Sequence, residues 1–379
     1  MKIMILQVGD IHLAEEKNSI ILKKNKIFEA VRNIALEVEH IFLVVNGDIA
    51  YSATEKQYEQ AIILIDHIIN KISEYSNKKV NCIFVPGNHD CNHNKEKIKI
   101  REMVLESVYR THEVDDAVID MCCDVQKNYF TFEELYQDGN IIYSDKLLKI
   151  VAFKFGNYDI IFNCYNTSWL SKKSEEIGRL YYPIDRYSSI LTAHRADTIV
   201  SIFHHPYNWY NPEASRSFNK YIDLSSDIVL TGHEHETSKK VNDDLNGNIT
   251  EYIECGILQD SEDSEKSSFN LIQLDLEKQY QKIISYCWNG ELYSASNVTD
   301  WIKYKRSVQL DKNLFKINDT FQSFIDDLGA TFLHPRKQKL ILEDIYTYPD
   351  LVKIGDWTED DPLEEGNKNL VNKKISSNI

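Results

Sequence analysis

The sequence has little that would tie the protein to a membrane or to an oxidising compartment. It contains no apolar run near the ~20 residues that span a bilayer. The apolar start of MKIMILQVGDIH is too short for a secretory signal and runs directly into polar residues. The seven cysteines form no CxxC pair, so neither a zinc ribbon nor a disulfide framework is indicated. We therefore expect reduced thiols and a cytoplasmic protein.

Positive charge is also scarce. The chain of 379 residues has 43 Lys and Arg against 59 Asp and Glu, which gives a net charge of −16. Such a chain lacks the positive face that charge-driven binding to nucleic acid requires. Local binding of an anionic substrate stays open, because bound divalent cations would add positive charge that this count omits.

Strands and helices alternate in the first half of the chain. Apolar runs at 2–8, 41–46 and 81–87 predict buried strands, and the segment 26–40 has its apolar residues on one helical face. The stretch Ser52–Glu55 has the spacing of a capping box and predicts the start of a second helix. Strands that are separated by helices pair in parallel through right-handed crossovers. The pattern therefore predicts an α/β fold.

The later parts of the chain differ from this first half. Residues 91–145 are less regular and predict a helical cap that is inserted near the mouth of a site. The chain then becomes rich in strands, and 1–295 is predicted to be one layered α/β domain. Residues 296–379 form a small extension that is partly β, with a polar tail that we expect to be flexible. No internal repeat is visible.

Five short polar motifs each follow a predicted strand. They are GDIH with Asp10 and His12, NGDIA with Asp48, GNHD with Asn88 and His89, FHHP with His204 and His205, and TGHEH with His233 and His235. Open α/β sheets place their sites beyond the carboxyl ends of strands. A single His or Gly-Asp after a strand is more often an ordinary core or surface feature, but five such motifs together predict a metal centre.

The candidate ligands are too many for one ion. Two Asp, one Asn and four His exceed the three or four protein ligands of a catalytic zinc. Mixed oxygen and nitrogen ligands without a thiolate fit Mn, Fe, Zn or Ni, among which we favour Mn. The sequence therefore predicts two divalent cations.

In this order, over roughly residues 1–290, the motifs resemble those of the calcineurin-like metallophosphoesterase superfamily. The resemblance implies a four-layer fold, in which helices flank two central β-sheets, and a dinuclear centre at one edge. It also implies the distribution of ligands: Asp10, His12 and His235 on one ion, Asn88, His204 and His233 on the other, and Asp48 between them. The family pattern places the metal-binding His two residues before the Pro of HHP, so His205 would support the fold or the ligands.

The resemblance further implies hydrolysis. Two divalent cations about 3.5–4 Å apart can turn a bridging water into hydroxide near neutral pH and hold the phosphate oxygens for in-line attack. His89 would contact the phosphate and act as general acid, or it would only orient the Asn88 loop. Relatives of Ser/Thr protein phosphatases carry an Asp followed by Arg-Gly where this chain has Tyr51, so a protein phosphatase is not expected. GNHD instead resembles the phosphodiesterase and nuclease branches.

We therefore expect a phosphodiesterase that acts on a nucleotide or on nucleic acid ends. The alternatives are a phosphomonoesterase of small esters and a metal-bound recognition module without catalysis. His205, Tyr207 and Trp209 are candidate substrate contacts, because aromatic rings beside a ligand can stack on a nucleobase; the rings could also merely pin a loop. The lysines of 94–101 could meet phosphates or form a solvated helix face.

The segment 332–354 carries a second resemblance. It is similar to segments that follow phosphoesterase domains in large bacterial multidomain proteins, some of them associated with phage defence and with P-loop ATPase modules. This chain contains no GxxxxGK[ST] motif, so an ATPase would belong to a partner or to a fused module. The resemblance implies the effector part of a defence protein, and the alternative is a small β-rich appendage on the core.

Overall fold

The structure is a computed structural model of the chain, and it describes residues 1–94, 98–243 and 249–304. The chain divides into two units, Met1–Gln309 and Leu310–Ile379, and every described residue belongs to the first unit. The predictions for the extension beyond residue 304, including 332–354 and the polar tail, lie outside the described residues. The same holds for Lys95 and Lys97 of the basic segment.

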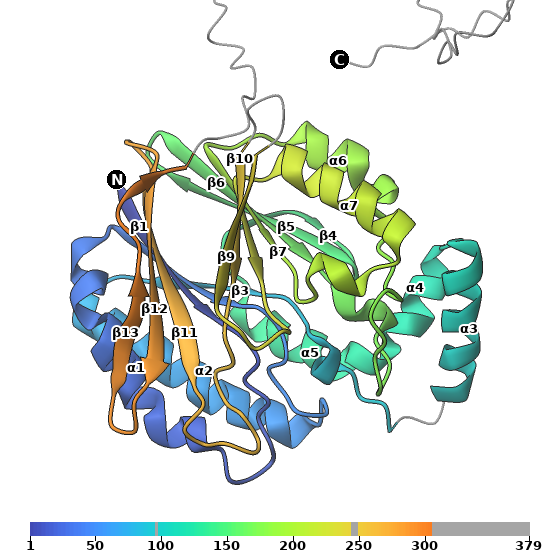
Figure 1. Cartoon of the computed structure of the whole chain (residues 1–379), viewed down its shortest axis with the longest axis horizontal. Helices are drawn as coiled ribbons and strands as arrows, with labels where there is room; N and C mark the ends of the chain where they lie inside the picture. The colour runs from blue at the N-terminus through green and yellow to red at the C-terminus, as the bar shows by residue number, and fades with distance from the viewer. Residues whose placement is uncertain (95–97, 244–248, 305–379) are drawn as a thin grey trace, which may run out of the picture. The chain divides into compact units, whose positions relative to one another are not determined.

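The first of two sheets has the strand order β13-β12-β11-β1-β2-β3, and β14 pairs with β12 (Figure 1). Its strands are β1 (Lys2–Val8), β2 (His40–Val45), β3 (Val80–Phe84), β11 (Ser268–Asp275), β12 (Tyr280–Trp288), β13 (Tyr293–Val298) and β14 (Ile302–Lys303). Strands β1, β2 and β3 are parallel, as the alternation of strands and helices predicts. Strand β11 pairs with β1 in the antiparallel sense and continues the sheet.

The second sheet has the order β4-β5-β6-β7-β8-β10-β9. Its strands are β4 (Asn140–Ser144), β5 (Leu148–Phe155), β6 (Tyr158–Tyr165), β7 (Thr198–Ile202), β8 (Ile228–Thr231), β9 (Ser238–Asp243) and β10 (Ile249–Glu254). Strands β6, β7, β8 and β10 are parallel neighbours, and antiparallel strands complete both edges. Strand β4 belongs to the predicted cap segment, yet it forms an edge of this sheet.

Four layers result from the way the strands bury both of their faces. Along β1, Ile3 and Ile5 enter the core between the two sheets, whereas Met4 and Leu6 pack on the helical side. Successive residues of a strand point to opposite faces, so one apolar run serves two cores. The helices are α1 (Ser19–Glu37) and α2 (Glu55–Ser76) beside the first sheet, α3 (Ile98–Thr111), α4 (Asp116–Cys123), α6 (Ser188–Ala193) and α7 (Pro212–Ser225) beside the second, and α5 (Lys127–Glu133) next to α2. The predicted four-layer α/β fold is confirmed.

Two helix starts differ from the sequence prediction. Helix α1 begins at Ser19 rather than at residue 26. Its first turns bury Ile20 and the aliphatic stem of Lys23, whose amine donates to a backbone carbonyl. Because Lys is a polar residue type, the sequence pattern does not show that this face of the helix is buried. In α2 the capping box is formed by Thr54 and Gln57 and not by the stretch Ser52–Glu55, because the Thr54 hydroxyl accepts from the Gln57 N–H and Gln57 accepts from the Thr54 N–H.

A buried arginine joins helices α3 and α4 to the loop that follows β6. Arg101 of α3 donates to the carbonyls of Cys122 at 2.9 Å, Trp169 at 2.9 Å and Ser171 at 2.8 Å. Helices α3 and α4 therefore hold the loop that follows β6, which borders the site described below (Figure 1). Within the described ranges, no helix is long and apolar enough to cross a membrane.

Candidate metal centre

The seven predicted ligands lie together where five strands end. Strands β1, β2 and β3 of the first sheet and β7 and β8 of the second each stop two to four residues before one of them. Ligand atoms of Asp10, His12 and His235 lie within 4.8 Å of one another, and the same holds for Asp10, Asp48 and His204. The prediction that the motifs follow strands and converge is confirmed, and both sheets contribute to one cluster.

A first group of ligands surrounds Asp10. The His235 Nε2 atom lies 3.4 Å from Asp10 Oδ1, and His12 Nε2 lies 3.2 Å from Asp48 Oδ2. Asp10 is fully buried, and its Oδ1 accepts no hydrogen bond from the described part of the chain. A buried carboxylate oxygen without a donor is unfavourable unless a cation lies against it. The chemistry of this group therefore fits a divalent ion.

A second group of ligands is built from neutral side chains. The Asn88 Oδ1 atom lies 3.0 Å from both His204 Nε2 and His233 Nδ1, and these two nitrogens are 3.1 Å apart. The His204 Nδ1–H donates to the Asn46 carbonyl at 2.7 Å, which leaves the lone pair on Nε2. Asp48 Oδ2 lies 3.3 Å from the same Nε2. Several acceptors thus converge on one point, as ligands of a cation do.

The buried charges favour a positive charge beside Asp48. Burial lowers the pKa of His204, but the carboxylates of Asp48 and Asp10 outweigh it and bring that pKa to about 10. Burial also acts against ionisation of Asp48, yet His204 and His12 hold the pKa of Asp48 well below its usual value. The pKa of His233 is lowered by burial and by the neighbouring His205 and His204. A proton or a divalent cation can supply the favoured charge.

The backbone is strained where these ligands turn inward. Positive φ angles are uncommon for residues other than glycine and require support from the surroundings. Five of the seven predicted ligands have one: Asp10 (50°), His12 (47°), Asp48 (53°), His233 (79°) and His235 (59°). Such strain concentrates at functional sites. Here it occurs at both residues of the motif pairs Asp10/His12 and His233/His235.

Two glycines allow the loops to meet. Gly47 has a φ of 90°, and a Cβ there would lie 2.7 Å from His204 Nδ1. A Cβ on Gly87 would lie 2.0 Å from Asp48 Oδ1. Asp90 then ties the loops after β2 and β3 together, since it is fully buried and accepts from the N–H groups of Ala50 at 3.0 Å and Gly87 at 2.9 Å. The sequence shows Asp90 in GNHD but gives it no role.

His89, the predicted general acid, lies next to His12 and Asp48. Its backbone N–H donates to Asp48 Oδ1 at 2.8 Å, and its Nδ1 lies 2.8 Å from the Tyr51 carbonyl. The His89 and His12 rings meet edge to face, with centroids 4.7 Å apart. Tyr51, which stands where related phosphatases carry a supporting Asp, thus supports His89 through its backbone. Donation from Nδ1 leaves Nε2 available to a substrate.

His205 and Glu175 form a buried pair behind the second group. His205 is fully buried, with Nε2 3.0 Å from Glu175 Oε2 and Nδ1 3.2 Å from Thr167 Oγ1. Glu175 Oε2 also lies 3.9 Å from His233 Nε2. Burial raises the pKa of Glu175, but His205 outweighs it, and the net shift is downward. Sequence reasoning missed Glu175, because it lies in the loop between β6 and β7 without any motif or spacing that marks it.

The two aromatic residues proposed to contact the substrate are separated in the structure. Trp209 stands edge-on to His233, with centroids 4.3 Å apart, and donates to Glu234 Oε1 at 2.6 Å. The Tyr207 hydroxyl lies 3.0 Å from that of Tyr252 on β10, in a neighbouring pocket. Only Trp209 therefore borders the cluster, and Tyr207 is part of a second feature.

Comparisons with known proteins identify the family of the chain. The sequence profile of the calcineurin-like phosphoesterase family matches residues 3–237. The metallophosphoesterase-like protein YydB of Bacillus subtilis is 23% identical over 336 residues, which cover 84% of this chain. The chain spans 66% of the length of that relative.

Similar solved structures share little sequence with the chain. PhoD is 9% identical, with a TM-score of 0.47 over 80% of this chain and 72% of that one. A phosphatase from Mycoplasma pneumoniae is 12% identical, with a TM-score of 0.36 over 81% of this chain and 94% of that one.

Proposed function

Because the chain belongs to the calcineurin-like phosphoesterase family, we propose that it hydrolyses phosphodiester bonds, in nucleotides or in nucleic acid ends, with the help of two divalent cations. The observation that carries the proposal is the convergence of carboxylate, amide and imidazole acceptors from five strand ends onto Asp48. Such a cluster without a lysine or arginine among its members has the composition of a metal site and not of a salt bridge.

The residues present fit two ions. Asp10, His12 and His235 would hold one of them, and the orphaned Asp10 Oδ1 would gain a partner there. Asn88, His204 and His233 would hold the other, with Asp48 between the two groups. When bound, two such cations would lower the pKa of a water molecule to near neutrality and offset the charge of the phosphate. Oxygen and nitrogen ligands without a thiolate are compatible with Mn.

His89 would act on the leaving group. Its backbone bond to Asp48 fixes the loop beside the ions, and its Nδ1 bond to the Tyr51 carbonyl orients the ring. The remaining nitrogen, Nε2, would hold the proton that the departing alkoxide needs. An acid of this kind contributes most where the leaving group is a sugar hydroxyl, because that alkoxide is a poor leaving group.

Two carboxylates support a preference for diesters over monoesters. Glu175 Oε2 lies 3.9 Å from His233 Nε2, and Glu234, the next residue along the chain, accepts a hydrogen bond from Trp209. A phosphodiester carries one negative charge at neutral pH, whereas a phosphomonoester carries nearly two. Repulsion between a carboxylate and the substrate grows with the charge of the substrate, so these two glutamates would disfavour the monoester.

The test compares three substrates in the presence of Mn²⁺. Single-stranded DNA, bis(p-nitrophenyl) phosphate and p-nitrophenyl phosphate are offered to the wild-type chain and to Asp48→Asn, with and without a chelator. We expect hydrolysis of both diesters, and its loss in the variant and with chelator. Hydrolysis of the monoester alone would establish the second candidate, a phosphomonoesterase. Two bound ions without turnover of any substrate would establish a recognition module.

A further inference from the structure

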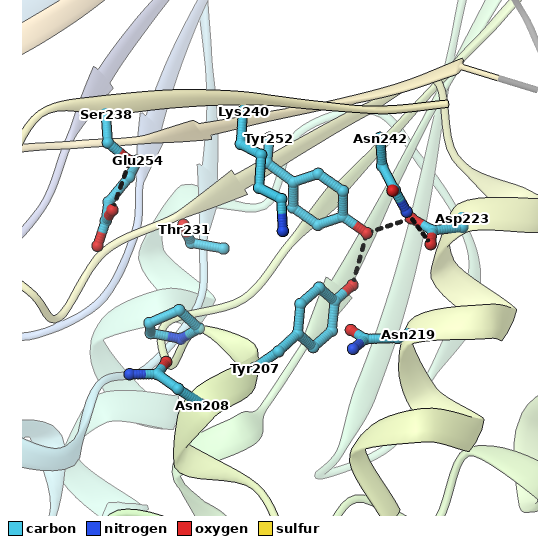
Figure 2. Close-up of a pocket in the computed structure, with 11 residues that line it drawn as sticks. Tyr207, Asn208, Asn219, Asp223, Thr231, Ser238, Lys240, Asn242, Tyr252 and Glu254 are labelled. Carbon is cyan, nitrogen blue, oxygen red and sulfur yellow. Dashed lines mark hydrogen bonds between the residues drawn. The ribbon is translucent and has the colours of Figure 1, made fainter. Parts of the chain in front are cut away.

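A cavity of about 320 Å³ opens beside the metal centre, between the short helix Tyr207–Trp209, α7 and the hairpin of β9 and β10 (Figure 2). We call it the tyrosine pocket, after Tyr207 and Tyr252 in its wall. We propose that this pocket binds the uncharged, hydroxyl-bearing part of the ester substrate, namely the sugar of a nucleoside with its base. The proposal rests on the function proposed above and names the substrate class.

The pocket and the metal centre take residues from the same segments of the chain. Thr231, which lines it, lies two residues before His233, and Tyr207 lies two residues after His205. Glu254, also in its wall, directly precedes Cys255, whose thiol lies 4.0 Å from Asp10 Oδ2. The segments that present the ligands thus also supply residues to the pocket, and the proposal is that one substrate reaches both.

A chain of hydrogen bonds keeps the far wall of the pocket in place. The Tyr207 and Tyr252 hydroxyls lie 3.0 Å apart, and Tyr252 donates to Asp223 Oδ1 (Figure 2). Asn242 Nδ2 donates to Asp223 Oδ2 at 2.5 Å. Since α7, β9 and β10 each contribute to this chain, the polar groups are oriented before any ligand arrives. Such preorganisation favours binding, because less ordering remains for the complex.

Some polar atoms of the pocket still lack a partner. Asn219 Oδ1 and Glu254 Oε1 are buried and accept no hydrogen bond from the residues that the structure describes. Buried acceptors of this kind are unfavourable until a donor reaches them. Sugar hydroxyls are donors of suitable size, and each can accept at the same time. Lys240, on the facing hairpin, offers a donor beside the Tyr252 ring (Figure 2).

The charge and shape of the pocket exclude a second phosphate as its main ligand. Asp223 brings a carboxylate against the single amine of Lys240, and Glu254 adds a carboxyl group whose pKa burial raises to about 7. The Tyr207 and Tyr252 rings meet at 69° with centroids 5.5 Å apart, and so they offer apolar surface to a neutral ring. Pockets for small organic ligands measure roughly 300–1,000 Å³, and the tyrosine pocket lies at the lower end of that range.

The experiment compares two chromogenic diesters that release the same p-nitrophenolate. Thymidine 5′-(p-nitrophenyl phosphate) carries a nucleoside, and bis(p-nitrophenyl) phosphate does not. The pocket variants are Tyr252→Phe and Asn219→Ala. Their matched controls lie on β4, at the opposite edge of the same sheet: Tyr143→Phe loses a hydroxyl that donates to Asp145 at 2.8 Å, and Asn140→Ala alters an exposed amide.

We expect each pocket variant to raise KM for the nucleoside ester about tenfold, the effect of one lost hydrogen bond, and to leave kcat/KM for bis(p-nitrophenyl) phosphate within about twofold. The controls should leave both esters unchanged. Equal effects on the two esters, or no effect on either, would overturn the proposal. Thermal melting of each variant identifies a change that results from unfolding.

A binding measurement separates this proposal from the proposed function. Thymidine, which has no phosphate to hydrolyse, is titrated into the whole chain by calorimetry. We expect binding that Tyr252→Phe and Asn219→Ala weaken about tenfold and that Asn140→Ala leaves intact. If the wild type cleaves neither ester but binds thymidine in this way, the phosphodiesterase proposal fails and the pocket assignment stands. If thymidine does not bind while the esters are cleaved, the pocket assignment fails alone.

Discussion

The two ligand groups of the centre differ in charge and in exposure, although they share Asp48. The first group contains the Asp10 carboxylate, and its His235 side chain is 35% exposed. The second group contains no carboxylate besides the shared Asp48, and its His204 is fully buried and bonded to the Asn46 carbonyl. The first group would therefore attract a cation mainly by charge and from the solvent side. The second would hold one mainly by the fixed positions of its ligand atoms.

The difference indicates how the two positions should exchange their ions. A site with a solvent-exposed ligand exchanges its ion with the solvent more readily than an enclosed site. A site of buried, preoriented ligands exchanges slowly and depends on every atom being in place. Variants of the shared residue Asp48 and of single ligands in each group can distinguish the two metal positions.

Replacement of Asp48 should have the largest effect, because both groups depend on it. We expect Asp48→Ala to reduce kcat by at least about 10³-fold, since bound metals supply several kcal/mol of stabilisation to the transition state. Metal analysis should find less than one ion per chain. Asp66→Ala, which removes a carboxylate bonded to Tyr136 at the surface of α2, is the control. Two retained ions in Asp48→Ala would show that the groups do not share this residue.

His204→Ala and His235→Ala should then distinguish the two groups. Loss of outer partners of a metal site lowers activity 10–100-fold, so loss of a ligand should cost at least about a hundredfold. We expect millimolar Mn²⁺ to restore much of the activity of His235→Ala, because water can replace an exposed ligand. His204→Ala leaves a buried gap and should not recover. Equal recovery of both variants would contradict the contrast between the groups.

His89→Gln should separate chemistry from metal binding. We expect kcat to fall about 10²-fold, as is typical for loss of a general acid, while both ions stay bound. The reduction should be smaller for p-nitrophenolate, which leaves without a proton, than for a sugar alkoxide. Tyr51→Phe keeps the backbone carbonyl that holds His89, and its activity should stay within about twofold of the wild type. Loss of metal from His89→Gln would instead mark a structural role.

Glu175→Gln should have the smallest effect and should act on the second group alone. The change removes a charge beside His205 and His233 but keeps the size of the side chain. We expect a decrease in kcat/KM for diesters of up to about tenfold, through looser positioning of the ligand. The neighbouring Glu176→Gln, in a side chain that is 71% exposed, is the control. An effect of equal size in the control would remove Glu175 from the site.

The ligand cluster could be predicted from sequence because each part is local. A buried strand followed by Gly-Asp, Asn-His or His-x-His is visible within ten residues, and parallel strands bring their carboxyl ends to one edge. The apolar runs predict the alternation of strands and helices, whereas the four layers were implied by the resemblance of the motifs to a known family. The predicted start of α1 was wrong because Lys23 is a polar residue type whose aliphatic stem is nevertheless buried, so the apolar pattern did not reveal the first turns of the helix.

Other features depend on contacts that no local pattern encodes. Glu175 reaches His205 across 30 residues, and the Tyr207 hydroxyl reaches Tyr252 across 45. The support that Tyr51 gives His89 comes from a backbone carbonyl, which any residue could offer.

The sequence by itself determined the alternation of strands and helices and the set of candidate ligands, because apolar runs and short motifs carry that information. The resemblance of those motifs to a known family implied the layers. Only the tertiary structure decided which atoms face each other, as when Asn88 Oδ1 meets His233 Nδ1 across 145 residues. It also decided that a pocket lies beside the cluster. The physical reason is that two sheets must pack before their edges can define a common surface, and this packing depends on the whole core.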